Sequence, residues 1–107
     1  MSSANNTLPP EQPIWWLYLL QCDHGLTYTG TTNDVDARFA KHQTGRGAKF
    51  TRINKPLSIL GAQPFPNRST ACQAEYRLKK LKPQHKMTWA KDWPWPPEKP
   101  WLHQPSI

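Results

Sequence analysis

The chain has 107 residues, enough for one domain with a modest core and too few for two. Its formal charge is +7, from 14 lysines and arginines against 7 aspartates and glutamates, and this balance indicates a polyanionic partner such as nucleic acid. Two cysteines do not make a disulfide framework, no spacing matches a zinc site, and the apolar run at 14–20 is too short to span a bilayer.

Residues 1–13 are rich in Ser, Asn and Pro, carry one charge and show no periodicity, so they predict a disordered leader. The apolar run that follows is preceded by Glu11 and not by the basic segment of a signal peptide. We therefore expect a soluble, cytoplasmic protein with reduced thiols and no membrane association.

Residues 14–30 predict a β-hairpin around which the domain is organised. Residues 14–22 are apolar except for Gln21, Asp23-His24-Gly25 form a loop signal, and 26–29 are good strand formers. Alternation places Trp16, Tyr18 and Leu20 on one face and three further apolar residues on the other, which is typical of a central strand with both faces buried.

Two phenols and a glycine in this hairpin indicate a functional site. Tyr18 and Tyr28 fall on paired strands, where their hydroxyls can approach on one face. Gly30 is expected to end the second strand, where a backbone or a phosphate can come close because no side chain intervenes.

The next segment, Thr-Thr-Asn-Asp at 31–34, predicts a helix start with Thr or Asn as the cap. The helix is expected to run to about His42 or Gln43 and to stop at Gly45. Arg38 then lies one turn before Lys41 or His42, and basic groups at that spacing can converge on one phosphate.

Residues 45–52 mix glycines with Arg46, Lys49, Arg52 and the hydroxyl of Thr51. They predict either a flexible loop that contacts phosphates or an ordinary solvated connection, and the sequence leaves both open. The spacing is not that of a nucleotide-binding P-loop.

Residues 56–65 predict a third strand, and 67–69 cap a second helix of roughly 70–81. Between Arg38 and Lys91 there are thirteen basic residues and one acidic residue, Glu75, which borders the apolar stripe of this helix. Glu75 is either an exposed partner of Lys79 at i+4 or a carboxylate positioned to bind a divalent metal, and we favour the metal. The apolar stripe is expected to consist of Ala71, Ala74, Leu78 and Leu81.

The C-terminal part predicts a short turn or helix over 83–90 and then extended, polyproline-like structure. Trp93, Trp95 and Trp101 in this tail can stack on bases, bind a protein partner or cover the small core, and we favour the cover. The predicted organisation is a leader at 1–13, a domain at 14–90 and a Pro/Trp-rich tail at 91–107.

Two tripeptides, Trp16-Leu17-Tyr18 and Tyr28-Thr29-Gly30, are followed by Arg38 and His42 on a helix, a Gly-Ala-Lys loop and Glu75 on the next helix. In this order they resemble the GIY-YIG nuclease superfamily, and most of all its small single-domain bacterial members related to the catalytic domain of Slx1 structure-specific endonucleases. The resemblance covers residues 14–87. Trp-Leu stands where the first motif has Gly-Ile, and Thr29 where the second has Ile.

The resemblance implies a small α/β (α+β) domain with a three-stranded antiparallel sheet flanked by helices, and one Mg²⁺ or Mn²⁺ held by Glu75. It implies an endonuclease that hydrolyses DNA, with branched, flapped or single-stranded substrates expected; the alternative is a non-catalytic nucleic-acid-binding module on the same fold.

The chemistry assigns a role to each residue of the set. Tyr18 would accept a proton from water with help from a basic neighbour, because an unperturbed phenol with a pKa of about 10 is a poor base. Glu75 would hold the metal that stabilises the leaving 3′ oxygen. The other expected roles are positioning of water or phosphate by Tyr28, a phosphate clamp by Arg38, proton transfer or a hydrogen bond to a tyrosine by His42, and nucleic-acid contacts by Gly30, Arg46, Lys49 and Arg52.

Overall fold

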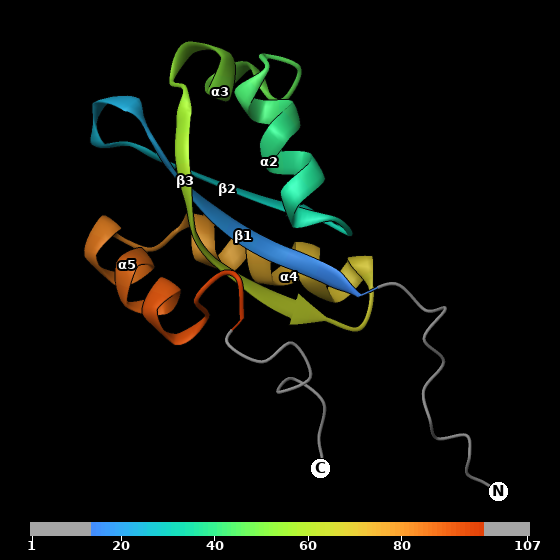
Figure 1. The fold of residues 1–107 in the computed structure, drawn as a ribbon. Coiled ribbons are helices and arrows are strands. Elements are labelled where there is room, and N and C mark those ends of the chain that lie inside the picture. The colour runs from blue at the N-terminus through green and yellow to red at the C-terminus, as the bar shows by residue number, and fades with distance from the viewer. Residues whose placement is uncertain (1–13, 98–107) are drawn as a thin grey trace, which may run out of the picture.

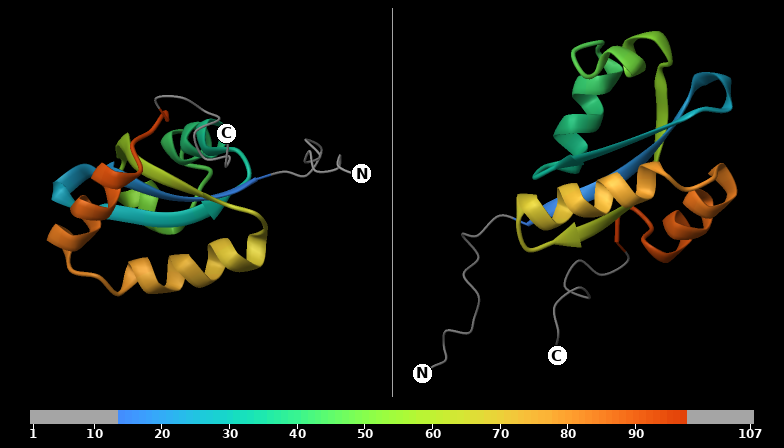
Figure 2. Two further views of the ribbon diagram at one scale, coloured as in Figure 1. Left: turned by 90° about the horizontal axis from the view of Figure 1, so that it is seen from below. Right: turned by 180° about the vertical axis from the view of Figure 1, so that it is seen from behind.

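The computed structural model of the protein describes residues 14–97. Its three strands form one antiparallel sheet in the order β2-β1-β3, and helices flank both faces (Figures 1 and 2), which confirms the predicted architecture. The elements are β1 (Trp15–Cys22), a 3-10 turn (Asp23–Gly25), β2 (Thr27–Thr32), α2 (Val35–Gln43), α3 (Lys49–Ile53), β3 (Pro56–Phe65), α4 (Arg68–Lys79) and α5 (Pro83–Asp92).

Strand β1 is the centre of the fold because both of its faces are covered. Tyr18 and Leu20 pack on the face shared with Val35 of α2, whereas Leu17 packs on the other face with Ala74 and the rest of the apolar stripe of α4. Figure 2 shows the sheet between α2 and α4. The alternation read from the sequence therefore places Trp16, Tyr18 and Leu20 on one face and Leu17 on the other, as observed.

The hairpin differs from the prediction in one respect that affects the site. Strand β2 continues to Thr32, so Gly30 lies inside the strand, paired with Tyr18, and the expectation that it ends the strand is wrong. The strand continues because the two threonines after Gly30 suit extended structure and pair with Leu17 and Trp16. The hairpin turn holds His24 and Gly25 in the left-handed region, at φ 67° and 70°.

Helix boundaries agree with the sequence to within a few residues. The cap of α2 is Asp34, whose carboxylate accepts from the Ala37 amide at 3.1 Å, and not the expected Thr or Asn. Asn67 caps α4 as expected, but α4 ends at Lys79 and leaves Leu81 40% exposed outside the apolar stripe. The Lys82-Pro83 step that follows favours this early end because a residue before proline avoids helical backbone angles.

The expected flexible loop at 45–52 is wrong for its second half, which forms the short helix α3. Two side chains hold it against the domain: Phe50 packs on the core cluster around Tyr18, and Thr51 is 2% exposed. Helix α3 thus forms because its side chains are buried by the fold, which a scan of local sequence does not detect.

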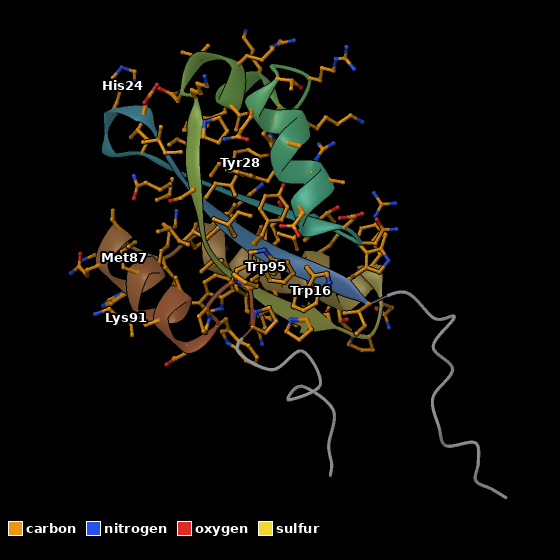
Figure 3. All side chains as sticks on the ribbon, viewed as in Figure 1. Trp16, His24, Tyr28, Met87, Lys91 and Trp95 are labelled. Atoms are coloured by element: carbon orange, nitrogen blue, oxygen red, sulfur yellow. The ribbon has the colours of Figure 1, made fainter. Side chains whose placement is uncertain are left out.

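The C-terminal segment covers the core, as the sequence favoured, and helix α5 extends beyond the predicted 90 to Asp92. The Trp93 carbonyl accepts from the Ala62 amide of edge strand β3 at 2.8 Å. The Trp95 ring then meets Trp16 edge-on, with centroids 5.0 Å apart (Figure 3), and its Nε1 donates to Asp36 of α2 at 3.1 Å. Trp101 and the predicted leader lie outside the described residues.

Candidate active site

A hydrogen bond between two buried side chains forms the centre of the site. The hydroxyl of Tyr18 lies 2.9 Å from Nε2 of His42, and the two residues are 2% and 1% exposed. Tyr18 comes from the central strand and His42 from the last turn of α2. The helix that covers this face of the sheet therefore places its imidazole within hydrogen-bond distance of the phenol.

Gly30 creates the space in which this phenol lies. A Cβ on Gly30 would collide with the Tyr18 hydroxyl and ring. The phenol thus extends from the central strand across Gly30 on the neighbouring strand β2, which is an edge of the sheet. The role of Gly30 seen in the geometry is this close packing against Tyr18.

The second nitrogen of the imidazole is also bonded. Nδ1 of His42 lies 2.8 Å from the Thr51 hydroxyl, which in turn donates to the Ala48 carbonyl at 2.8 Å. Gly47 directly precedes Ala48, and a Cβ at Gly47 would collide with the His42 ring. Gly47 hence allows the backbone of this segment to lie against the histidine.

Burial, followed by the nearby Tyr28 and Glu75, raises the pKa of the Tyr18 hydroxyl to about 12, although Arg38 acts in the opposite direction through a hydrogen bond and its charge. The phenol is therefore protonated at neutral pH and donates to His42. Without a proton acceptor it would be deprotonated less often at neutral pH than a free tyrosine in water.

Burial and the positive charge of Arg38 lower the pKa of His42 to about 4. The imidazole is consequently neutral at pH 7 and has one nitrogen available as an acceptor. A protonated phenol hydrogen-bonded to a neutral imidazole is an arrangement in which the proton can move from oxygen to nitrogen.

Tyr28 lies beside this pair without bonding directly to it. Its ring centroid is 5.0 Å from that of His42 and 6.3 Å from that of Tyr18, and it stacks on Phe50 at 5.9 Å. Figure 3 shows Tyr28 between the sheet and α2. The structure thus brings both tyrosines to one face, as the hairpin predicted.

Glu75 approaches from the other side, on α4. Its side chain is 20% exposed and pairs with Lys79 at 3.0 Å, so the ion pair considered from the sequence is present. Its charge nonetheless reaches Tyr18, because it is one of the causes that raise the phenol's pKa. Glu75 is hence a surface ion-pair partner whose charge also acts on the Tyr18 hydroxyl.

The donor set at Glu75 fits a divalent cation only if most of the cation's ligands are water and substrate oxygens. Residues 14–97 contain no group of three or more His, Cys, Asp or Glu side chains that converge on one point. Mg²⁺, however, keeps several waters and commonly takes one or two carboxylates together with substrate phosphate oxygens. A single half-buried carboxylate such as Glu75 matches that mode of binding.

Comparison with known proteins identifies the family of this domain. Residues 14–88 match the GIY-YIG catalytic domain. The chain belongs to the GIY-YIG superfamily. Within this superfamily the chain belongs to the UPF0213 proteins. It is 51% identical over 73 residues to a UPF0213 protein from Cupriavidus pinatubonensis, and the match covers 68% of this chain and 81% of that relative. A UPF0213 protein from Xanthomonas campestris is 47% identical over 75 residues, covering 70% and 74%.

A solved structure supports the fold. The solution structure of the protein EF2693 from E. faecalis is 32% identical, with a TM-score of 0.51, and the match covers 74% of this chain and 84% of that one. Membership of the GIY-YIG superfamily implies a nuclease-type function. The relation to Slx1 endonucleases suggested by the motifs stays a prediction.

An open groove of about 490 Å³ runs along α2 of this GIY-YIG domain. Three cations line it, Arg38, Lys41 and Arg46, together with Asp34 and several small side chains. Arg46 therefore shares a surface with Arg38. Lys49 and Arg52 are exposed on α3 and do not line the groove.

Lys41 lines the groove with Arg38, which lies one turn before it on the same helix, as their spacing in the sequence indicates. One residue of the GIY-YIG site was not singled out from the sequence. Thr51 was noted only as a hydroxyl among cations, and nothing in the local sequence indicates that it bonds to His42.

No helix within 14–97 combines the length and apolar character needed to cross a membrane.

Proposed function

We propose that this protein is a metal-dependent endonuclease that hydrolyses phosphodiester bonds in DNA, with branched, flapped or single-stranded DNA as substrates. The observation that carries the proposal is the hydrogen bond between Tyr18 and His42, with Arg38 beside both groups. A phosphodiester is cleaved when water is deprotonated, the phosphoryl charge is neutralised and the leaving oxygen is stabilised. The side chains near Tyr18 supply groups for each task.

Water activation uses Tyr18 and His42 as a relay. The phenol oxygen accepts a proton from the attacking water while its own proton moves to Nε2 of His42. The resulting hydroxide attacks phosphorus, and the 3′ oxygen leaves with the electron pair of its bond. Tyr18 alone, with a pKa of about 12, would not be a base at neutral pH, so the imidazole is the final acceptor.

Arg38 links substrate binding to this relay. Its charge is one of the two causes that lower the pKa of His42. A substrate phosphate bound to the guanidinium would partly neutralise that charge, because charge-assisted bonds to phosphate bring the two groups into direct contact. The imidazole would then become a stronger base when the scissile phosphate is present.

The groove along α2 gives the substrate strand a path toward Tyr18. Lys41 and Arg46 share it with Arg38, so they would bind phosphates that flank the scissile one. Such contacts are independent of sequence, and their strength falls as salt rises. Lys49, Arg52 and the backbone at Gly30 are further proposed contacts, and Tyr28 is proposed to position the water or the phosphate.

Glu75 is the proposed metal ligand. A bound Mg²⁺ or Mn²⁺ would supply positive charge that stabilises the leaving 3′ oxygen. The chain's own part is to present one carboxylate at the edge of the Tyr18 site and to release it from Lys79 when the cation binds.

The test is cleavage of end-labelled single-stranded, duplex and branched DNA by the purified protein with Mg²⁺ or Mn²⁺. We expect cleavage by the wild type and at least a 100-fold loss in Glu75→Gln. Asp92→Asn, which removes an exposed carboxylate at the end of α5, is the matched control and should retain full activity. Equal cleavage by wild type and Glu75→Gln would exclude the mechanism.

The ion pair between Glu75 and Lys79 favours a second candidate, a non-catalytic nucleic-acid-binding module, because it already neutralises the carboxylate without metal. This module would bind DNA in a salt-dependent way without metal-dependent turnover. Its binding would survive both Glu75→Gln and Tyr18→Phe. The cleavage assay above separates the two candidates.

A further inference from the structure

We propose that Thr51 is a positioning residue: its hydroxyl holds His42 in the form that carries its proton on Nδ1, so that Nε2 is the acceptor of the Tyr18 proton. The inference rests on the proposed function for its catalytic meaning. The hydrogen bonds that support it exist independently of any activity. Four groups are joined in sequence, from Tyr18 through His42 and Thr51 to the Ala48 carbonyl.

The direction of each bond follows from the last group in the series. A carbonyl oxygen has no hydrogen to give, so at the 2.8 Å contact between Thr51 and Ala48 the threonine hydroxyl donates. A hydroxyl has one hydrogen, and at the 2.8 Å contact with Nδ1 the threonine oxygen must therefore accept. Nδ1 of His42 consequently carries the proton.

A neutral imidazole with its proton on Nδ1 has a lone pair on Nε2. At 2.9 Å from the Tyr18 hydroxyl this nitrogen accepts, and the phenol donates. The opposite arrangement would leave the oxygens of Thr51 and Ala48 2.8 Å apart with no hydrogen between them. The carbonyl of a loop residue thereby sets the proton position on a histidine and, through it, the role of a tyrosine.

The surroundings show that this arrangement is held in place. Thr51 and His42 are 2% and 1% exposed, so water has little access to replace either bond. Gly47 lets the backbone lie directly against the imidazole, where any Cβ would collide with the ring. Phe50, next to Thr51, packs on the core and stacks with Tyr28, which anchors the short helix that carries the hydroxyl.

The first measurement is the tautomer of His42, read by ¹⁵N NMR of the metal-free, DNA-free full-length protein at neutral pH. We expect protonated Nδ1 and unprotonated Nε2 in the wild type. In Thr51→Val, which has nearly the same shape and no hydroxyl, we expect a shift toward protonated Nε2 or a mixture. Thr51→Ser restores the hydroxyl and should restore the wild-type pattern.

The second measurement is DNA cleavage by the same variants with Mg²⁺. We expect kcat to fall about 10-fold or more in Thr51→Val, as is usual when a group that orients a reactive side chain is lost, with KM unchanged within about twofold. Thr51→Ser should regain most of kcat. Thr88→Val is the matched control, because it removes a hydroxyl that bonds to a helix carbonyl on the exposed surface of α5.

The results separate this inference from the proposed function. Protonated Nε2 in the wild type would overturn the inference whether or not the protein cleaves DNA. A folded Thr51→Val that keeps the wild-type tautomer and kcat would also overturn it. If the wild type shows protonated Nδ1 but cleaves nothing, the proposed function fails and the assignment of Thr51 as the residue that sets the tautomer stands.

Discussion

The hydroxyl of Tyr18 and Nε2 of His42 lie 2.9 Å apart in a part of the molecule where both residues are almost fully buried. The bond connects the central strand to the helix that covers it, and it connects a protonated phenol to a neutral imidazole. Any change that moves either ring should therefore affect the proposed chemistry more than it affects the rest of the fold.

Gly30→Ala is a direct way to move the phenol. The added methyl would collide with the Tyr18 hydroxyl, so the ring must shift. We expect cleavage to fall at least 100-fold and the free energy of unfolding to fall by about 1–3 kcal/mol, the usual cost of overpacking. Cleavage rates and urea denaturation of the purified variant measure the two effects.

Gly25→Ala is the control for that experiment. Gly25 has φ +70° and no atom within 4 Å of its missing Cβ, so alanine there costs about 1 kcal/mol of backbone strain and touches no part of the site. It should keep wild-type cleavage. Similar activity losses in both variants would show that stability, and not the position of Tyr18, limits the reaction.

The buried, neutral His42 makes stability depend on pH. Its pKa is about 4 in the folded protein and near 6.5 when unfolded, so the unfolded chain binds the proton first as pH falls. The contribution of the neutral imidazole to the free energy of unfolding is complete above about pH 6.5 and is lost as pH falls to about 4. The difference between the two pKa values corresponds to about 3 kcal/mol. An NMR titration of His42 should give a midpoint well below 6; a midpoint near 6.5 would contradict the assigned burial effect.

The metal proposed to bind Glu75 would compete for the carboxylate with Lys79. Removing it in Lys79→Ala abolishes the ion pair at 3.0 Å, and exposed i,i+4 pairs are worth about 0.3–0.5 kcal/mol. We therefore expect Mn²⁺ to bind about twofold more tightly, as measured by calorimetry. Lys80→Ala removes the same charge from the adjacent residue, which lies over the Tyr76 ring at 4.0 Å, and should change the affinity less. An equal change in both variants would mean that net charge alone controls metal affinity.

The tail contributes to stability through Trp95. Trp95→Ala removes the edge-on contact with Trp16 and the hydrogen bond to Asp36, and we expect a loss of about 2 kcal/mol in the free energy of unfolding. Asp36→Ala removes only the hydrogen bond and should cost about 1 kcal/mol or less. Equal losses would show that the hydrogen bond, and not the ring contact, holds the tail.

Local patterns in the sequence were sufficient for most of the fold. The alternation in β1 follows from a strand with two buried faces, and the bounds of β3 coincide with those predicted because prolines mark its ends. The start of α4 was also predictable, since Asn67 caps it with a side-chain bond that depends only on nearby residues. These elements are specified by residues close to them in the sequence.

The site was only partly predictable because its key contacts join distant segments. The motif order indicated Tyr18, His42 and Glu75, and a hydrogen bond from His42 to a tyrosine was one of the expected roles. It did not indicate which ring nitrogen makes that bond or that the other nitrogen bonds to Thr51. Helix α3 was missed for the same reason, since burial of its side chains stabilises it. Gly30 was placed at the end of a strand because the pairing of Thr31 and Thr32 depends on the partner strand.

The most direct test of the central claim is the single-turnover rate of DNA cleavage by Tyr18→Phe compared with the wild type, at saturating Mg²⁺ and at one pH. The variant keeps the ring and removes only the hydroxyl that bonds to His42. We predict a loss of at least 100-fold, within the range typical of proton-transfer groups, with DNA affinity preserved. A folded Tyr18→Phe that cleaves at the wild-type rate would contradict the relay and, with it, the proposed mechanism.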